Sequence, residues 1–217
     1  MSSPYQEAQR VGQDAVRAAF LDCAISLLVT EGPVALTMRR IAADVGSSTK
    51  VLYTMFGGKE GLVDALYREG FVRLRRTQEQ VPRGEDPLAY LIELGRVYRE
   101  SALAAPGYYR LMFERPVPGF QPSAEALAVA ETAFGASVSA VHACMEAGIL
   151  RPGDAHEASK LFWAAAHGAV SLELAGHFAP AEAGPRYEAL LAALGRALST
   201  RVSPTCAPPS AVERPTP

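Results

Sequence analysis

The 217-residue sequence predicts an all-α protein with about nine helices, and three observations carry this prediction. Apolar residues recur at spacings of three and four, as on one face of a helix, whereas strand-like alternation is hard to find. Clusters of Gly and Pro separate these periodic segments. Apolar residues make up 49% of the chain and charged residues 20%, a composition that supports a packed core.

The N-terminal part of the chain is predicted to hold four helices. Val16, Phe20, Cys23 and Leu27 mark one face of a first helix, which the Gly and Pro of residues 31–33 end. Two short helices are expected over residues 37–44 and 48–56, and a long fourth helix over residues 59–80. Residues 82–84 then form a linker, because Pro and Gly interrupt the helical pattern there.

Longer helices follow this linker. Apolar stripes predict helices over residues 88–98, 106–113, 127–148, 154–178 and 183–199, and the Pro-rich residues 116–122 form a loop. Residues 201–217 contain five prolines and no core pattern, so they are expected to be a disordered tail.

Composition excludes several classes of protein. A net charge of −2 excludes a polycation that coats nucleic acid by charge alone, so any contact with nucleic acid must be a small patch. The three cysteines are far apart in the sequence, which argues against a disulfide framework or a zinc ribbon. No apolar run is expected to span a bilayer, and the polar N-terminus does not resemble a secretory signal. The chain is therefore predicted to be cytoplasmic, with no membrane partner.

Residues 37–56 carry the strongest functional signal, because two short helices flank a turn with Gly at its centre. This arrangement is typical of a helix-turn-helix. Ile41 and Val45 are predicted to face inward, and Gly46 permits the positive φ that such a turn needs. Leu52 and Phe56, four residues apart, would anchor the second helix to the core.

That anchoring leaves a polar face on the second helix of the pair. Its hydroxyls and single cation are short enough to reach base edges and phosphates in a major groove. The free backbone N–H groups at the helix N-terminus would also attract phosphate. The side chains predicted on or beside this face are Ser48, Thr49, Lys50, Tyr53 and Thr54.

The run from residue 37 to residue 62 resembles the DNA-binding domain of TetR/AcrR-type transcriptional regulators. It contains T-x-R-x-I-A, a Gly turn, L-Y-x-x-F and then Lys59-Glu60-x-Leu62. The resemblance implies that Thr37, Arg39 and Lys59 hold phosphate, that Thr49 and Lys50 probe bases, and that Tyr53 contacts the DNA backbone. Two departures leave the operator sequence open. Lys50 stands where the family often has Gly, and Gly57-Gly58 stand where Pro-Ser is frequent.

The helical remainder is similar to the ligand-binding and dimerisation domain of the same family. Trp163 with His167-Gly168, and the segment 106–113, resemble its tryptophan/histidine-glycine branch. The implied organisation is a helix-turn-helix DNA-binding domain over residues 1–58, an effector-binding and dimerisation domain over residues 59–200, and the tail. The implied function is a homodimeric repressor that a small apolar or amphipathic effector releases from a palindromic operator.

The predicted effector pocket is built from aromatic and other apolar side chains with a few polar groups. Aromatic residues at helical spacing are also common in an ordinary core, and His167 suits either a hydrogen-bonded core position or a polar handle in the pocket. The candidates are Tyr98, Tyr109, Met112, Phe113, Phe120, His142, Trp163 and His167.

Two other classes of function remain open from the sequence. A helical small-molecule-binding protein would keep the pocket but lack affinity for DNA. A small helical enzyme would need a polar cluster in its core, for which His142, Glu146 and His167 are the candidates. The chain has none of the common catalytic motifs and no second His at zinc-peptidase spacing from His156, so neither an enzyme nor a metal or other cofactor is expected.

Overall fold

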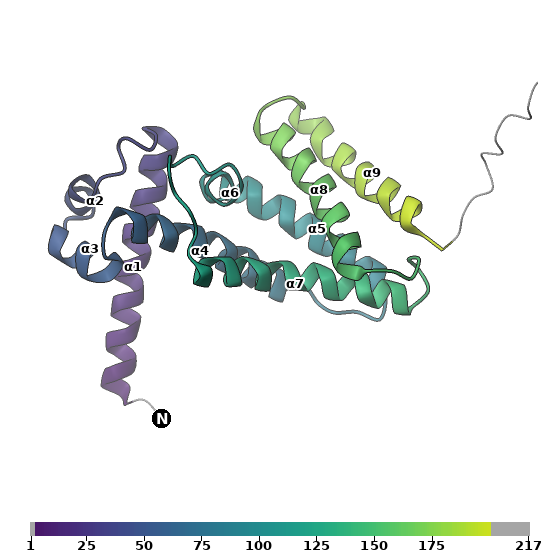
Figure 1. Cartoon of the computed structure of the whole chain (residues 1–217), viewed down its shortest axis with the longest axis horizontal. Helices are drawn as coiled ribbons and strands as arrows, with labels where there is room; N and C mark the ends of the chain where they lie inside the picture. Colours follow the sequence, from purple (N-terminus) through teal and green to yellow (C-terminus); the bar gives the residue numbers. More distant parts are fainter. Residues whose placement is uncertain (1–2, 201–217) are drawn as a thin grey trace, which may run out of the picture.

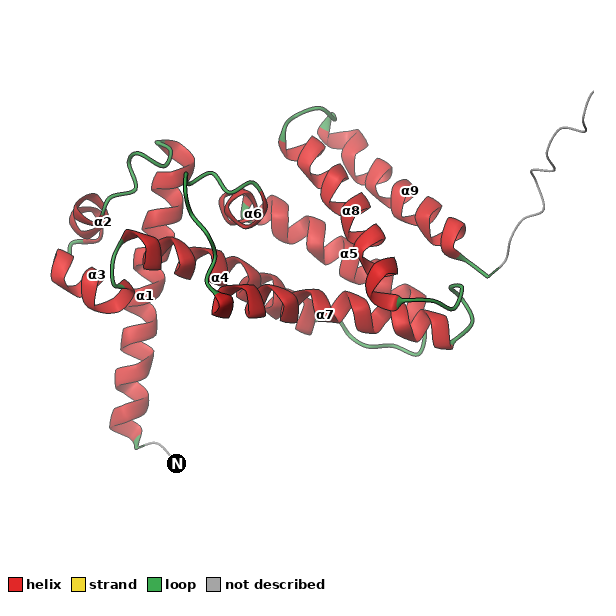
Figure 2. Ribbon diagram, viewed as in Figure 1, coloured by secondary structure: helices red, strands yellow, loops and turns green. Residues whose placement is uncertain are grey.

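The computed structural model of the protein describes residues 3–200, and within them it contains nine α-helices and no strand (Figure 2). The predicted all-α fold is therefore confirmed. The tail predicted over residues 201–217 lies outside the described part of the chain. The helices are α1 (Pro4–Thr30), α2 (Met38–Val45), α3 (Thr49–Phe56), α4 (Lys59–Glu79), α5 (Pro87–Ala104), α6 (Pro106–Phe113), α7 (Ala124–Glu146), α8 (Ala155–Leu174) and α9 (Pro180–Leu198).

Local capping sets the bounds of α2 and α3. The Thr37 hydroxyl accepts a hydrogen bond from the backbone N–H of Arg40, and the Ser48 hydroxyl accepts one from that of Val51. Each helix ends at a glycine in the left-handed region, Gly46 at φ 71° and Gly57 at φ 74°. Because Gly adopts this conformation without a Cβ clash, the turn chemistry predicted from the sequence is confirmed.

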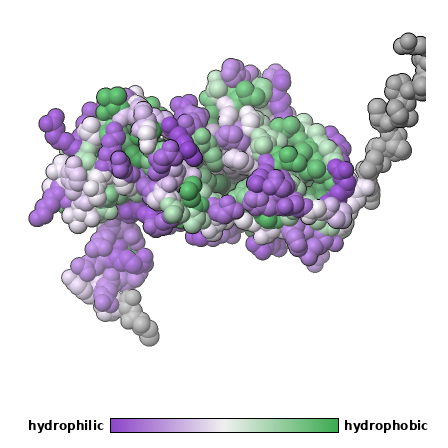
Figure 3. Space-filling model, viewed as in Figure 1, coloured by the Kyte–Doolittle hydropathy of each residue, from purple (hydrophilic) through white to green (hydrophobic). Residues whose placement is uncertain are grey.

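The first helix is longer than its apolar pattern indicated. It starts at Pro4, where the Ser3 and Gln6 side chains form a reciprocal capping box. Its N-terminal half projects away from the molecule and is covered by hydrophilic atoms (Figures 1 and 3). Val16, which the sequence placed on the inward face, is 42% exposed, because core packing begins only at Phe20.

Helix α4 connects the N-terminal helices to the larger bundle. Its first turns pack against α1 and α3, and along its length it lies beside α6 and α7 (Figure 1). Leu62, Leu66 and Phe71 are buried in a core cluster that extends from α1 to α9. The helix-turn-helix unit and the bundle therefore share one continuous core, so a shift of α4 is transmitted to both.

Helix α7 corrects the expectation that no segment is long and apolar enough to cross a bilayer. It has 23 residues with a mean hydropathy of 1.3 over its most apolar window. In the structure it packs against α4, α5 and α8 as part of the helical bundle. Alanines raise its hydropathy and allow close packing, which is a property of bundle helices as well.

Candidate nucleic-acid interface and internal cavity

The second helix of the helix-turn-helix, α3, is held by two buried side chains. Leu52 is fully buried and Phe56 is 8% exposed, with its ring edge-on to Phe20 of α1 at 6.3 Å. Ile41 of α2 is also fully buried. The predicted inward residues thus fix the orientation of α3, and its opposite face is left to solvent.

All eight residues predicted to contact DNA lie at exposed positions. Tyr53, a large aromatic residue, is 54% exposed, which is unusual for a side chain without a partner surface. Lys50 and Arg39 form no ion pair with another described residue, so both cations are available to an anionic ligand. The exposed set is Thr37, Arg39, Ser48, Thr49, Lys50, Tyr53, Thr54 and Lys59.

Three of these residues also have structural contacts. Thr37 and Ser48 cap α2 and α3, and the Nζ of Lys59 donates a hydrogen bond to the carbonyl of Pro33 at 3.1 Å. Each capping hydroxyl uses its oxygen as the acceptor, so its own proton remains free to donate. The Lys59 contact ties the start of α4 to the loop before α2, at the same end of the molecule as α3.

The neighbouring arginines have intramolecular partners. Arg40 pairs with Glu31 and Asp44. Farther along α4, Arg73 pairs with Asp22 of α1 at 2.9 Å and lies over the ring of Tyr108 of α6. Arg73 therefore has the geometry of a brace between helices.

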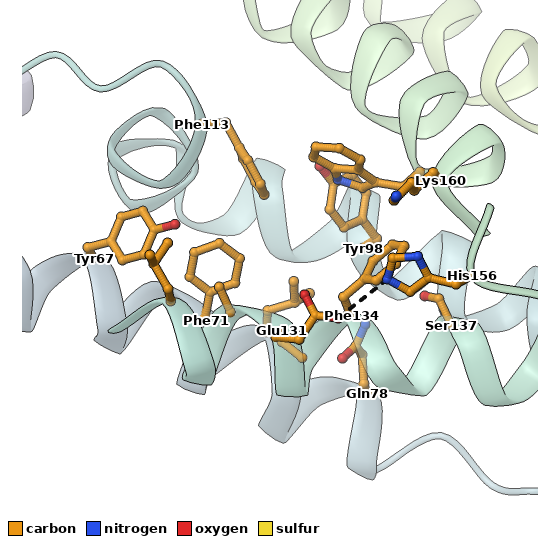
Figure 4. Close-up of a pocket in the computed structure, with 15 residues that line it drawn as sticks. Tyr67, Phe71, Gln78, Tyr98, Phe113, Glu131, Phe134, Ser137, His156 and Lys160 are labelled. Atoms are coloured by element: carbon orange, nitrogen blue, oxygen red, sulfur yellow. Dashed lines mark hydrogen bonds and ion pairs between the residues drawn. The ribbon is translucent and has the colours of Figure 1, made fainter. Parts of the chain in front are cut away.

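A cavity of about 380 Å³ that is partly open to solvent lies in the larger bundle, between α4, α5, α6, α7 and α8 (Figure 4). Its volume falls within the range of small-molecule sites, which is roughly 300–1,000 Å³. Six aromatic rings contribute to its walls: Tyr67, Phe71, Tyr98, Phe113, Phe134 and Trp163. The arrangement suits an apolar ligand with ring systems that stack or pack edge-on.

The predicted pocket residues divide into three groups in the structure. Tyr98, Phe113 and Trp163 line the cavity. Tyr109 and Met112 line an adjoining space of about 40 Å³ instead. Phe120 packs against Tyr67, with ring centroids 6.0 Å apart, and lies outside the lining.

The two histidines predicted for the pocket also lie outside its lining. The His142 side chain is 62% exposed, with Nδ1 3.4 Å from Glu146, so the i, i+4 pair lies on the outer surface of α7. The spacing of four residues places His142 and Glu146 on the same helix face, but it does not determine whether that face points inward. The prediction of His142 as a pocket residue is wrong for this reason.

His167 lies one layer behind the cavity wall, in a hydrogen-bonded cluster. Its Nδ1 is 2.8 Å from the Tyr109 hydroxyl and 3.2 Å from the Tyr98 hydroxyl, and its ring stacks on that of Tyr109. Burial lowers the pKa of His167, because the charged imidazolium is poorly solvated there. This geometry agrees with the prediction that His167 is a hydrogen-bonded core residue, and not with the alternative that it is a polar group of the effector pocket.

The lowered pKa of His167 predicts a pH-dependent stability. At pH values below about 6.5, the unfolded chain binds a proton at this histidine that the folded chain resists. The free energy of unfolding should therefore fall as the pH is lowered from 7.5 to 5.5. Urea unfolding should show a smaller fall in the variant His167→Gln, which cannot take up the proton. An equal fall in both proteins would contradict this assignment.

Sequence reasoning missed the polar end of the cavity. Glu131 of α7 and His156 of α8 are 3.4 Å apart across the bundle, although 25 residues separate them in the sequence. Gln78, near the end of α4, was not among the predicted pocket residues, yet it is 5% exposed. Its spacing of four and seven residues from Leu74 and Phe71 is a signal that could have placed it inward. The polar lining residues are Gln78, Glu131, Ser137, His156 and Lys160.

Comparison with known proteins agrees with this architecture. Residues 20–66 match the family described as bacterial regulatory proteins of the tetR family, and residues 91–194 match the tetracyclin repressor-like C-terminal domain. The latter match does not confirm the expected tryptophan/histidine-glycine branch. The HTH-type transcriptional regulator Rv1816 of Mycobacterium tuberculosis is 24% identical over 201 residues, covering 78% of this chain and 85% of that protein.

Solved structures show the same fold. A protein of unknown function from Rhodococcus sp. RHA1 superimposes with a TM-score of 0.74 at 26% identity, covering 85% of this chain and 96% of that one. The putative regulatory protein SCO4313 gives a TM-score of 0.69 at 26% identity, covering 89% and 98% of the two chains. With both domain types matched in order along the chain, the protein belongs to the TetR family of DNA-binding transcriptional regulators.

Proposed function

We propose that the protein acts in the cytoplasm as a homodimeric repressor, which a small apolar or amphipathic molecule releases from a palindromic operator. The exposed face of α3, anchored from behind by Leu52 and Phe56, carries this proposal. In the proposed complex, Thr49 and Lys50 reach base edges, with Ser48 and Thr54 beside them. Thr37, Arg39, Tyr53 and Lys59 hold the DNA backbone. The proposal assigns the chain no catalytic step.

An exposed apolar face on α8 and α9 supports the dimer. Leu161 is 52% exposed, Leu172 is 44% exposed and Leu190 is 40% exposed. Between the two leucines of α8, exposed Ala164 and Gly168 continue the stripe at helical spacing. Figure 3 shows hydrophobic atoms gathered over these helices. Two such faces would pack as a four-helix bundle, because small residues allow helices to approach closely.

Two copies are needed because one short helix reads few base pairs. A two-fold symmetric dimer places two recognition helices in grooves about 34–36 Å apart and combines their contacts. We propose that the interface lies at α8 and α9, and that the two α3 helices read the two half-sites of the operator.

Helix α6 supplies the proposed link between cavity and DNA. Its Phe113 lines the cavity, whereas Gly107 at its other end approaches α1 so closely that an added Cβ would lie 2.6 Å from Val29. On α4, an added Cβ at Gly70 would lie 2.5 Å from the Met112 sulfur. A ligand that displaces Phe113 would therefore move α6 against both α1 and α4. A shift of a few ångströms at α3 would then cost base contacts.

Lys50→Ala tests the DNA interface. Its operator affinity should fall about tenfold to a hundredfold, because each contact to a base or phosphate contributes about 1–3 kcal/mol. Tyr53→Phe should also weaken binding, by removing one hydroxyl contact. The operator is first selected from random duplexes with the full chain, and affinity is then measured at several salt concentrations.

Arg76→Ala is the matched control for this test. It removes a cation from the exposed last turn of α4, 17 residues beyond Lys59 and therefore roughly 25 Å from the start of that helix. It should bind the operator like the wild type. Wild-type affinity in both Lys50→Ala and Tyr53→Phe would refute the assigned contacts. Failure of the wild type to bind any duplex at low salt would favour a ligand-binding protein without affinity for DNA.

A further inference from the structure

Two polar side chains at one end of the cavity lack hydrogen-bond partners. Gln78 of α4 is 5% exposed, and its Oε1 is buried without a partner among the described residues. The hydroxyl of Ser137, on α7, likewise has no hydrogen bond to another described residue. Figure 4 shows both side chains at the same end of the cavity. An unpaired buried amide oxygen is unfavourable, so a ligand group that pairs with it would bind favourably.

The bonding capacity of these two side chains specifies a ligand group. The buried amide oxygen of Gln78 is an acceptor, and a ligand group that donates to it would supply the missing hydrogen bond. The Ser137 hydroxyl can donate one. A hydroxyl group on the ligand can satisfy both at once, because it donates through its proton and accepts through its oxygen.

The charged groups in the lining already have hydrogen-bond partners. The Nζ of Lys160 lies 2.7 Å from a carboxylate oxygen of Glu157, and His156 lies 3.4 Å from Glu131. The Glu131 side chain is 71% exposed, so water solvates the carboxylate. A charged ligand would lose its own hydration to meet groups that already have a hydrogen-bond partner or water, whereas a neutral ligand loses little.

The rest of the cavity determines the shape of the ligand. Beyond the polar end, the walls consist mainly of aromatic rings from five helices, with Phe113 against Trp163 at 5.9 Å and Phe134 against Trp163 at 6.3 Å. Such walls favour flat ring systems, which stack or pack edge-on against them. A volume of about 380 Å³ limits the ligand to a few rings.

We propose that the cavity binds a neutral, flat aromatic molecule whose single hydroxyl group donates to Gln78 and accepts from Ser137. The proposal rests on the effector function proposed above, because it specifies the molecule that would enter the same cavity. It names Gln78 and Ser137 as the residues that determine specificity, and the aromatic walls as the source of most of the affinity.

A series of biphenyl probes tests this inference on the full chain. The series comprises 4-phenylphenol, its methyl ether 4-methoxybiphenyl, the anion biphenyl-4-carboxylate and the cation formed by 4-phenylbenzylamine. Binding is followed by the fluorescence of Trp163, which is the only tryptophan in the sequence and lines the cavity. This readout needs no DNA, so it is independent of the operator measurement.

The phenol should bind about tenfold more tightly than its methyl ether, because the ether cannot donate to Gln78. Gln78→Met keeps the length of the side chain but removes the acceptor, so it should bring the two affinities together. Ser137→Ala should reduce the preference in part. Gln80→Met, two residues along the chain and exposed, should retain the full preference. Thermal unfolding of each variant confirms that it is folded.

Four results would overturn the inference: equal binding of phenol and ether by the wild type, an unchanged preference in Gln78→Met, tightest binding of the acid or the amine, or no binding of any probe. Adding 4-phenylphenol to the complex with the operator separates this inference from the effector switch. If the phenol binds with the predicted preference but the DNA stays bound, the ligand class stands and the switch is wrong.

Discussion

Leu161→Glu is expected to make the protein monomeric and to lower its operator affinity at least about a hundredfold. Leu161 is 52% exposed on α8, at one end of the apolar stripe that we propose as the dimer interface. A carboxylate there would be buried against the partner without a counter-ion, which is strongly unfavourable. The affinity for a specific site typically exceeds the affinity for non-specific DNA by a factor of about 10³ or more. A monomer contacts only one half-site and therefore loses much of this difference in affinity.

Light scattering on the eluting protein measures the oligomeric state, and titration of the selected operator measures the affinity. Leu103→Glu is the matched control, since Leu103 is 36% exposed at the end of α5, away from the proposed interface. It should remain dimeric and bind DNA like the wild type. A dimeric Leu161→Glu would remove α8 from the interface. A monomer with full operator affinity would show that dimerisation is not needed for DNA binding.

Gly61→Ala is expected to have the largest effect within the DNA-binding unit. Gly61 lies in the first turn of α4, and a Cβ added there would be 1.9 Å from the carbonyl oxygen of Phe56 at the end of α3. Since that atom belongs to the backbone, α3 and α4 must move apart to relieve the clash. Overpacking of this kind typically costs about 1–3 kcal/mol of folding stability, and here it would also reorient α3.

Urea unfolding and operator titration of Gly61→Ala should therefore show both lower stability and weaker DNA binding. Gly12→Ala provides the control, because a Cβ at Gly12 in the exposed half of α1 would meet no atom of residues 3–200 within 4 Å. That substitution should stabilise the protein by up to about 1 kcal/mol, through the higher helix propensity of Ala. Wild-type stability and affinity in Gly61→Ala would mean that α3 and α4 do not approach this closely.

The helix-turn-helix was predictable because its determinants are local. Thr37 and Ser48 cap helices within three residues of their own positions, and Gly46 supplies the positive φ of the turn. Leu52 and Phe56 belong to one helix, so their spacing alone indicates the buried face. The candidate DNA contacts follow from the same spacing, because the face opposite the buried residues must be exposed.

The cavity was only partly predictable because its walls come from helices that are distant in the sequence. Tyr98, Phe113 and Trp163 could be named as aromatic candidates, but spacing within a helix does not distinguish a cavity wall from a filled core. The same limitation misplaced His142, whose pairing with Glu146 is satisfied equally well on the outside of α7.

The amino-acid sequence by itself determined the helical class, the helix α3 and its exposed polar face, because caps, turns and periodicity act over a few residues. Only the tertiary structure decided which side chains share the cavity: Gln78, Glu131 and His156 come from three helices whose meeting depends on the packing of α4, α7 and α8. The physical reason is the range of the interactions. Hydrogen bonds within a helix turn are specified by neighbouring residues, whereas a cavity is the space left when separate helices pack together.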